Sequence, residues 1–124
     1  MIIRTLEQVP SVDWGNGASR RFLTKSDGIG YSITDTIVTA GTKSHLEYRN
    51  HLESCYCIAG SGEVIDEAGN AYPIVPGTMY ALDEHDAHYL IASPHEDLRL
   101  VCVFTPALVG DEAHSLGDSQ TSHY

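Results

Sequence analysis

The sequence lacks any long run of apolar residues, and it is poor in basic residues. No stretch approaches the roughly 20 apolar residues that a transmembrane helix needs, so a membrane-spanning protein is not expected. Lysine and arginine number 7 against 17 acidic residues, which gives a formal net charge of −10. The acidic residues are dispersed and no basic patch offsets them, so neither nucleic acid nor an anionic membrane surface is expected as a partner.

Cysteine is also scarce, with Cys55, Cys57 and Cys102 as the three examples. Cys55 and Cys57 are two residues apart on an expected strand, where a disulfide between them is geometrically poor. The odd number of cysteines and the lack of a recognisable signal peptide predict a reducing, cytoplasmic location. The Cys-x-Cys pair differs from the paired Cys-x-x-Cys ligands of zinc ribbons, so a structural zinc site is not predicted.

Helical periodicity is missing as well, and the chain consists instead of short strand-like segments between turns. Residues 31–39 alternate apolar and small polar side chains, and residues 98–104 form the clearest strand, whose even-numbered side chains share one face. The segment Glu67–Asn70 has the composition of a hairpin turn. Eight or more such strands, spaced by about ten residues, predict an all-β fold, a small antiparallel β-barrel or jelly roll with room for one ligand in its mouth.

The length of 124 residues predicts a single domain, residues 1–124. The apolar start Met1–Ile3 suggests an edge strand within residues 1–10. The glycine-rich segment 11–18 is expected to be a loop, and it carries Trp14. A polar C-terminal tail is expected from about residue 110.

The stretch from Tyr48 to Glu63 passes from polar residues into a short apolar run and ends in a Gly-Ser-Gly turn. If this stretch is extended, alternation places His51, Glu53, Cys55 and Cys57 on one face. A carboxylate and an imidazole beside thiols are typical of a metal-binding or catalytic lining. The alternative is an ordinary strand that is polar where it begins and apolar where it ends, without a binding or catalytic role.

Two of the few basic residues, Arg20 and Arg21, are adjacent in an expected strand at 19–23. Because side chains alternate along a strand, only one of them can point inward. The pair is therefore either a set of surface salt bridges or includes one inward-facing clamp for an anion.

Ordered, collinear motifs run along nearly the whole chain. They are Arg4–Glu7, Ser19–Arg21, Asp35–Ile37, Ala40–Thr42, Asn50–Glu53, Tyr56–Ile58, Gly60–Val64, Tyr72–Ile74, Pro76–Thr78, Tyr80–Asp83, His85–His88 and Arg99–Phe104. In these motifs the chain resembles the ectoine synthase family, whose members are small cupins. The common cupin pattern has a His-x-His pair ahead of its glutamate; the corresponding residues 46–49 contain no histidine here, so a standard four-ligand cupin site is not expected.

The resemblance implies a dimeric, iron(II)-dependent hydro-lyase that closes N-γ-acetyl-L-2,4-diaminobutyrate to ectoine, a compatible solute made under osmotic stress. By motif, the metal ligands fall on Glu53, Tyr80 and His88, whose oxygen and nitrogen donors suit iron(II). The implied substrate contacts are Trp14, Arg21, Thr36, His51, Cys102 and Phe104, and the implied acid–base residues are Tyr48, Glu112 and His114. How the acid and base roles are divided among the last three stays open.

Two segments depart from the family pattern. The loop between Trp14 and Arg21 is longer by a few residues, and the tail after His114 ends differently. Two other interpretations therefore stay open beside ectoine synthesis. One is a related cupin that acts on a different small substrate, and the other is a non-catalytic cupin that binds a small ligand. A metal triad together with acid–base groups favours an enzyme.

Overall fold

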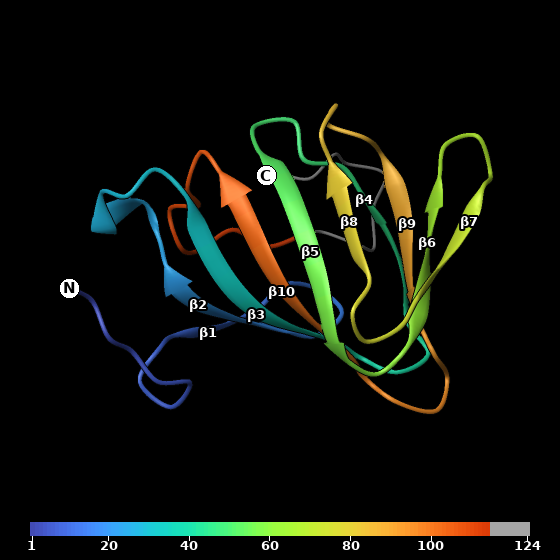
Figure 1. Ribbon diagram of the computed structural model, residues 1–124, viewed down its shortest axis with the longest axis horizontal. Helices are drawn as coiled ribbons and strands as arrows, with labels where there is room; N and C mark the ends of the chain where they lie inside the picture. Colours follow the sequence, from blue (N-terminus) through green and yellow to red (C-terminus); the bar gives the residue numbers. More distant parts are fainter. Residues whose placement is uncertain (115–124) are drawn as a thin grey trace.

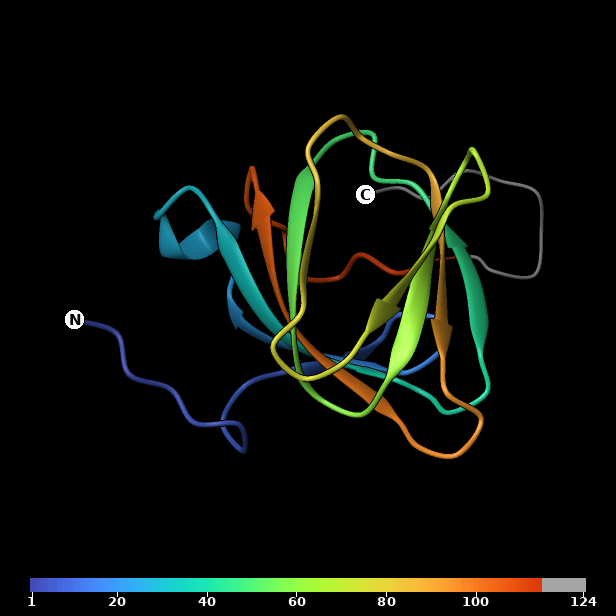
Figure 2. The same ribbon diagram turned by 45° about the vertical axis from the view of Figure 1, so that its right-hand side comes forward.

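The structure, a computed structural model, describes residues 1–114, which form two antiparallel β-sheets facing each other as an open sandwich (Figures 1 and 2). In chain order the elements are β1 (Ser11–Asp13), β2 (Ala18–Leu23), the 3-10 helix η1 (Lys25–Asp27), β3 (Ser32–Val38), β4 (Lys43–Leu46), β5 (Leu52–Ala59), β6 (Gly62–Asp66), β7 (Ala71–Ile74), β8 (Met79–Leu82), β9 (His88–Ala92) and β10 (Leu98–Thr105).

The larger sheet has the strand order β1-β2-β3-β10-β5-β8, and the smaller sheet has the order β4-β9-β6-β7. The last strand, β10, therefore lies inside the larger sheet, between β3 and β5. The predicted all-β, antiparallel architecture is confirmed, although the two sheets form a sandwich and do not close into a barrel. The predicted hairpin turn at Glu67–Asn70 does join two paired strands, β6 and β7.

The core lies between the sheets and follows the alternation expected from the sequence. In β10, Leu98, Leu100, Cys102 and Phe104 are buried, whereas the residues between them are more exposed. Burying a leucine or phenylalanine side chain contributes on the order of 2 kcal/mol to stability, so this face holds the larger sheet onto the smaller one. Within residues 1–114, no helix is long and apolar enough to cross a membrane.

The prediction of an edge strand within residues 1–10 is wrong. Met1 and Ile3 are exposed, and Arg4 instead holds this segment against η1 through a 2.8 Å ion pair with Asp27. The first strand is β1, which lies in the segment that was expected to be a loop. The sequence pattern missed it because β1 is only three residues long and depends on pairing with β2.

Gly17, between β1 and β2, has a positive φ of 153°, and a Cβ there would lie 1.9 Å from the Ile37 carbonyl oxygen. Only glycine fits this position, so the β1–β2 turn can press against β3. The polar tail expected from about residue 110 falls partly within the described part of the chain, and residues 115–124 lie outside it. A single domain over residues 1–124 stays a prediction.

Candidate active site

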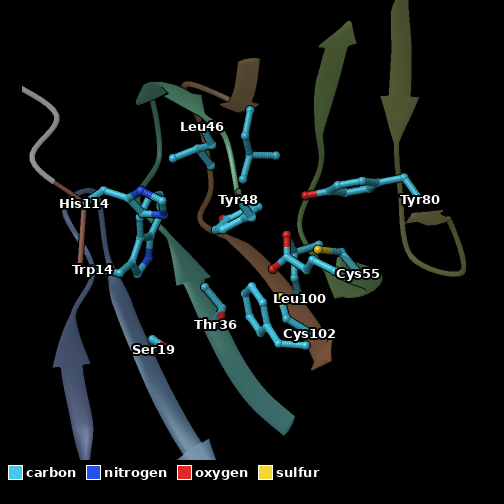
Figure 3. Close-up of a pocket in the computed structure, with 13 residues that line it drawn as sticks. Trp14, Ser19, Thr36, Leu46, Tyr48, Cys55, Tyr80, Leu100, Cys102 and His114 are labelled. Carbon is cyan, nitrogen blue, oxygen red and sulfur yellow. The ribbon is translucent and has the colours of Figure 1, made fainter. Parts of the chain in front are cut away.

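A cavity of about 390 Å³, including the part open to solvent, lies between the two sheets (Figure 3). Its lining combines aromatic rings, thiols, hydroxyls and one carboxylate, which makes it the natural place for small-molecule chemistry. The lining residues are Trp14, Ser19, Thr36, Leu46, Tyr48, Glu53, Cys55, Tyr80, Leu90, Leu100, Cys102, Phe104 and His114.

The cavity brings together many of the residues predicted to form a site, but not all. Those that line it are Trp14, Thr36, Tyr48, Glu53, Tyr80, Cys102, Phe104 and His114. The predicted residues that do not line it are Arg21, His51, His88 and Glu112. His88 is nevertheless close, because its ring centroid is 6.1 Å from that of Tyr48 and 6.3 Å from that of Tyr80.

One row of side chains crosses five strands of the larger sheet. The strand registers pair Arg21 with Thr34, Thr34 with Cys102, Cys102 with Cys55, and Cys55 with Tyr80. All of them except Tyr80 are buried, and Tyr80 packs against the core. The row explains how residues far apart in sequence meet at one end of the sandwich.

Glu53 lies on β5 beside this row and is 94% buried, with 6% of its surface exposed. The thiols of Cys55 and Cys102 are hydrogen-bonded to its carboxylate, and the ligand atoms of the three residues lie within 4.8 Å of one another. The predicted alternation along β5 is confirmed, since His51, Glu53, Cys55 and Cys57 are all buried.

Burial raises the pKa of Glu53 to about 7, although the two thiol hydrogen bonds oppose the shift. Burial also raises the pKa of Tyr80 well above its ordinary value, and negative charge on Cys55 or Glu53 would raise it further. Both shifts have the same largest cause, which is that burial removes water from around the charged form of each group. A bound cation would reverse both shifts.

His88, on β9 of the opposite sheet, is 1% exposed. Its Nδ1 lies 2.9 Å from the Asp86 carbonyl oxygen, so Nδ1 carries the proton and Nε2 presents a lone pair. Nε2 is buried and has no hydrogen-bond partner among the described residues. Burial lowers the pKa of His88, which keeps the ring neutral. An oriented, neutral imidazole with a bare nitrogen is the arrangement of a metal ligand, so His88, Glu53 and Tyr80 fit a metal ion chemically.

Aromatic rings form the other side of the cavity. Tyr48 packs edge-on against Phe104 and against His114, with centroid distances of 5.3 Å in both cases. Trp14 lies 5.9 Å from His114 and donates its indole N–H to the Ile37 carbonyl oxygen. Burial, followed by the charges of His88 and Arg21, lowers the pKa of His114 to about 4. His114 is therefore a neutral imidazole at pH 7, within reach of a bound ligand.

The two adjacent arginines point to opposite sides. Arg20 faces outward and forms a 2.6 Å ion pair with Asp35, whereas the Arg21 side chain is buried. Arg21 donates hydrogen bonds to Ser19 Oγ, to the Glu112 carbonyl oxygen and to the Glu112 carboxylate. The sequence left open whether one of the two arginines points inward to bind an anion. Arg21 does point inward, and the anion that it binds is the Glu112 carboxylate of its own chain.

Arg21 and the backbone of its own segment both hold the Glu112 carboxylate. Besides the Arg21 contact, the carboxylate accepts hydrogen bonds from the backbone N–H groups of Val109 and Gly110, each 2.8 Å long. Burial would raise the pKa of Glu112, but these backbone bonds and Arg21 outweigh it and lower the pKa. Glu112 is thus an ionised anchor for its segment. His51 lines a separate pocket together with Glu112, and its Nδ1 lies 2.7 Å from the Pro106 carbonyl oxygen.

Sequence analysis missed some of the lining. Leu46, Leu90 and Leu100 are apolar members without a predicted role, and Ser19 is a polar one. Cys55 was predicted by alternation to share the inward face of β5 with Glu53, and that position is confirmed, although no individual role was predicted for it. Ser19 could not have been found in this way. Whether it points into the cavity depends on how β2 pairs with β3, and the sequence does not reveal that pairing.

The buried carboxyl of Glu53 predicts a pH-dependent stability for the metal-free protein. Its pKa is about 7 in the fold and 4.5 in an exposed carboxyl, so the folded state holds the extra proton between these values and stability falls as the pH rises through them. Glu53→Gln, which cannot ionise, should therefore stabilise the metal-free protein by up to about 3 kcal/mol near pH 8 and by almost nothing near pH 4. Urea unfolding of both proteins at several pH values measures this; a difference that does not change with pH would contradict it.

Comparisons with known proteins agree on one family. The family model described as ectoine synthase matches residues 1–122. L-ectoine synthase of Desulfatibacillum aliphaticivorans is 52% identical over 121 residues, which cover 92% of both proteins. The L-ectoine synthase of Wolinella succinogenes is 46% identical over 121 residues, covering 92% of this chain and 91% of the relative. The crystal structure of ectoine synthase from P. lautus superimposes with a TM-score of 0.83 at 46% identity, covering 89% of this chain and 81% of that one.

Proposed function

The chain belongs to the ectoine synthase family and is a lyase that forms ectoine, and we propose that it does so by closing N-γ-acetyl-L-2,4-diaminobutyrate in the cavity between its sheets, with loss of water. The observation that carries the proposed site is His88, whose buried Nε2 has no hydrogen-bond partner in the described part of the chain and whose ring lies 6.3 Å from the Tyr80 ring.

Glu53, Tyr80 and His88 would hold an iron(II) ion. Their carboxylate, phenol and imidazole are donors that iron(II) accepts, and three protein ligands leave positions open for substrate. When bound, the metal supplies Lewis-acid polarisation of a carbonyl oxygen. The support on this chain is chemical, since the buried carboxylate and phenol have raised pKa values that a cation would compensate.

The cavity walls would fold the flexible substrate so that its α-amine meets its own acetamide carbonyl carbon. Trp14, Tyr48 and Phe104 supply apolar surfaces, and Thr36 and Ser19 supply hydroxyls for polar ends of the substrate. Holding both reacting groups in one geometry removes much of the entropic cost of ring closure. This contribution comes from substrate binding by the side chains, and it is separate from the chemistry that the metal supplies.

Ring closure also needs proton transfers. The substrate ammonium must lose a proton before its nitrogen can form the new C–N bond, and the carbonyl oxygen must gain protons to leave as water. We assign the base role to His114, which lines the cavity as a neutral imidazole, and the acid role to the adjacent Tyr48. Glu112 is bound by Arg21 and by the backbone, so its role would be to hold the segment that carries His114.

An anaerobic assay tests the reaction directly. Purified protein is incubated with iron(II) and N-γ-acetyl-L-2,4-diaminobutyrate, and ectoine is followed by chromatography. We expect ectoine only when iron is present, and a drop of at least about a hundredfold in His88→Ala, since a metal ligand is lost. His95→Ala, which removes an exposed histidine from a loop, is the control and should keep full activity.

Bound iron without ectoine would contradict the proposed substrate and would favour a related cupin that acts on another small molecule. If the protein binds no iron and forms no product, that result would favour a non-catalytic cupin. Within the same proposal, the enzyme would act in the cytoplasm and supply a compatible solute under osmotic stress.

We also propose a homodimer. The apolar residues Met1, Ile2 and Ile3 are exposed, and β8 forms one edge of the larger sheet as the described residues define it. A strand edge and an apolar segment are both surfaces that a second copy can cover. Light scattering at working concentration should give the mass of two chains; the mass of one chain would contradict the dimer.

A further inference from the structure

Cys55 occupies the centre of the buried polar cluster, although the proposed reaction gives it no role. Its side chain is 2% exposed, and the residue lines the cavity. It is hydrogen-bonded to the carboxylate of Glu53 and to the hydroxyl of Tyr80. Figure 3 shows the Cys55 and Tyr80 side chains entering the cavity from the same side.

The two hydrogen-bonded neighbours of Cys55 are also the two proposed oxygen ligands. Ligand atoms that share one ion lie roughly 3–4 Å apart, because each metal–ligand bond is about 2.0–2.3 Å long. An atom within hydrogen-bonding reach of both Glu53 and Tyr80 is already at the spacing of a further ligand. The sulfur atoms of Cys55 and Cys102 and a Glu53 oxygen lie within 4.8 Å of one another.

We propose that Cys55 is a sulfur ligand of the metal ion, so that this chain binds its metal through carboxylate, phenolate, imidazole and thiolate donors. The inference rests on the proposed metal site and deepens it. On binding, the Cys55 thiol releases its proton to solvent and the sulfur takes one coordination position. Four protein donors still leave two positions of a six-coordinate ion for the substrate.

The other two cysteines are less suited to this role. Cys102 is hydrogen-bonded to Glu53 and to Cys55, so it contacts the cluster from the β10 side, away from Tyr80 on β8. Cys57 Sγ lies 3.4 Å from the Ala59 carbonyl oxygen, near the far end of β5.

A thiolate donor from Cys55 would also shift the metal preference of the site. Compared with a site that has only oxygen and nitrogen donors, it would favour thiophilic ions such as Co²⁺ and Zn²⁺.

Cobalt(II) loading of the full-length, metal-free protein tests the proposal without an activity assay. A thiolate bound to Co²⁺ gives a charge-transfer absorption band in the near ultraviolet, which carboxylate and imidazole ligands do not. We expect this band in the wild type and its loss in both Cys55→Ser and Cys55→Ala, with Co²⁺ affinity reduced at least tenfold, an order of magnitude typical of disturbed metal sites. Cys57→Ser is the matched control, on the same face of the same strand, and should keep the band.

Several results would overturn the assignment. Stoichiometric Co²⁺ binding by the wild type without the band would exclude sulfur ligation while leaving the metal site intact, and this measurement needs no variant. Loss of the band in Cys102→Ser with its retention in Cys55→Ser would exclude Cys55. The band with undiminished Co²⁺ affinity in both Glu53→Ala and His88→Ala would contradict the proposed metal site itself. No Co²⁺ binding by the wild type would contradict both proposals.

Discussion

Replacing Glu53 by alanine abolishes tight binding of a divalent ion, with an expected loss of affinity of at least about a hundredfold. Glu53 supplies the single carboxylate of the cavity lining, and its charge is the one that a cation would stabilise most, because burial raises its pKa to about 7. Without it, the other proposed ligands, Tyr80, His88 and Cys55, would have to hold a dication without any carboxylate. Iron content after desalting under anaerobic conditions measures the effect.

Glu67→Ala is the appropriate control for that experiment. Glu67 carries the same charge, but its side chain is 63% exposed and pairs with the exposed His45 on the outside of the smaller sheet. The control separates the loss of a ligand from the loss of one unit of the large negative charge. Metal content equal to that of the wild type in Glu53→Ala would show that Glu53 is not a ligand.

Arg21→Ala should cost about 3 kcal/mol of stability and lower the rate of ectoine formation at least tenfold. The guanidinium is buried and binds both the carboxylate and the backbone carbonyl of Glu112, so its removal leaves a partly buried charge without its cation. The segment from Val109 to His114 would then be less well fixed, and His114 would leave its place beside Trp14 and Tyr48. Urea unfolding measures the stability, and steady-state kinetics measure the rate.

The adjacent Arg20→Ala is a matched control, since Arg20 binds Asp35 in a partly buried ion pair and Asp35 keeps Arg99 as a second partner. Because that second cation stays in place, the loss of stability should be smaller than in Arg21→Ala. Hydrogen exchange distinguishes the proposed tether from a direct substrate anchor. If Arg21 holds the segment, amides of residues 109–112 exchange faster in Arg21→Ala. An increase in KM with unchanged exchange would instead indicate that Arg21 binds the substrate.

The inward face of β5 could be predicted from sequence because alternation has a fixed period. Once residues 52–59 are extended, Glu53, Cys55 and Cys57 must point the same way, and they are all buried. The same local rule applies to β10, where every second side chain enters the core. These predictions need no knowledge of which strand lies beside which.

Long-range pairings could not be predicted in this way. The contact between Arg21 and Glu112 joins residues 91 positions apart, and it depends on how the segment after β10 crosses the sandwich. The β1–β2 pairing was missed for a similar reason, since three residues carry too little pattern to reveal a strand. The bare Nε2 of His88 is also a property of the assembled fold, because it depends on what packs around the ring.

The position of β10 has a consequence for how the protein forms in the cell. This strand is synthesised after β3 and β5, yet it lies between them and joins them. Until it leaves the ribosome, β3 and β5 each present an open edge, and the nascent chain cannot build the cavity wall that includes Leu100, Cys102 and Phe104. The larger sheet can therefore complete its folding only after β10 has been synthesised, and a chain that ends before Leu98 should aggregate instead of giving a smaller folded protein.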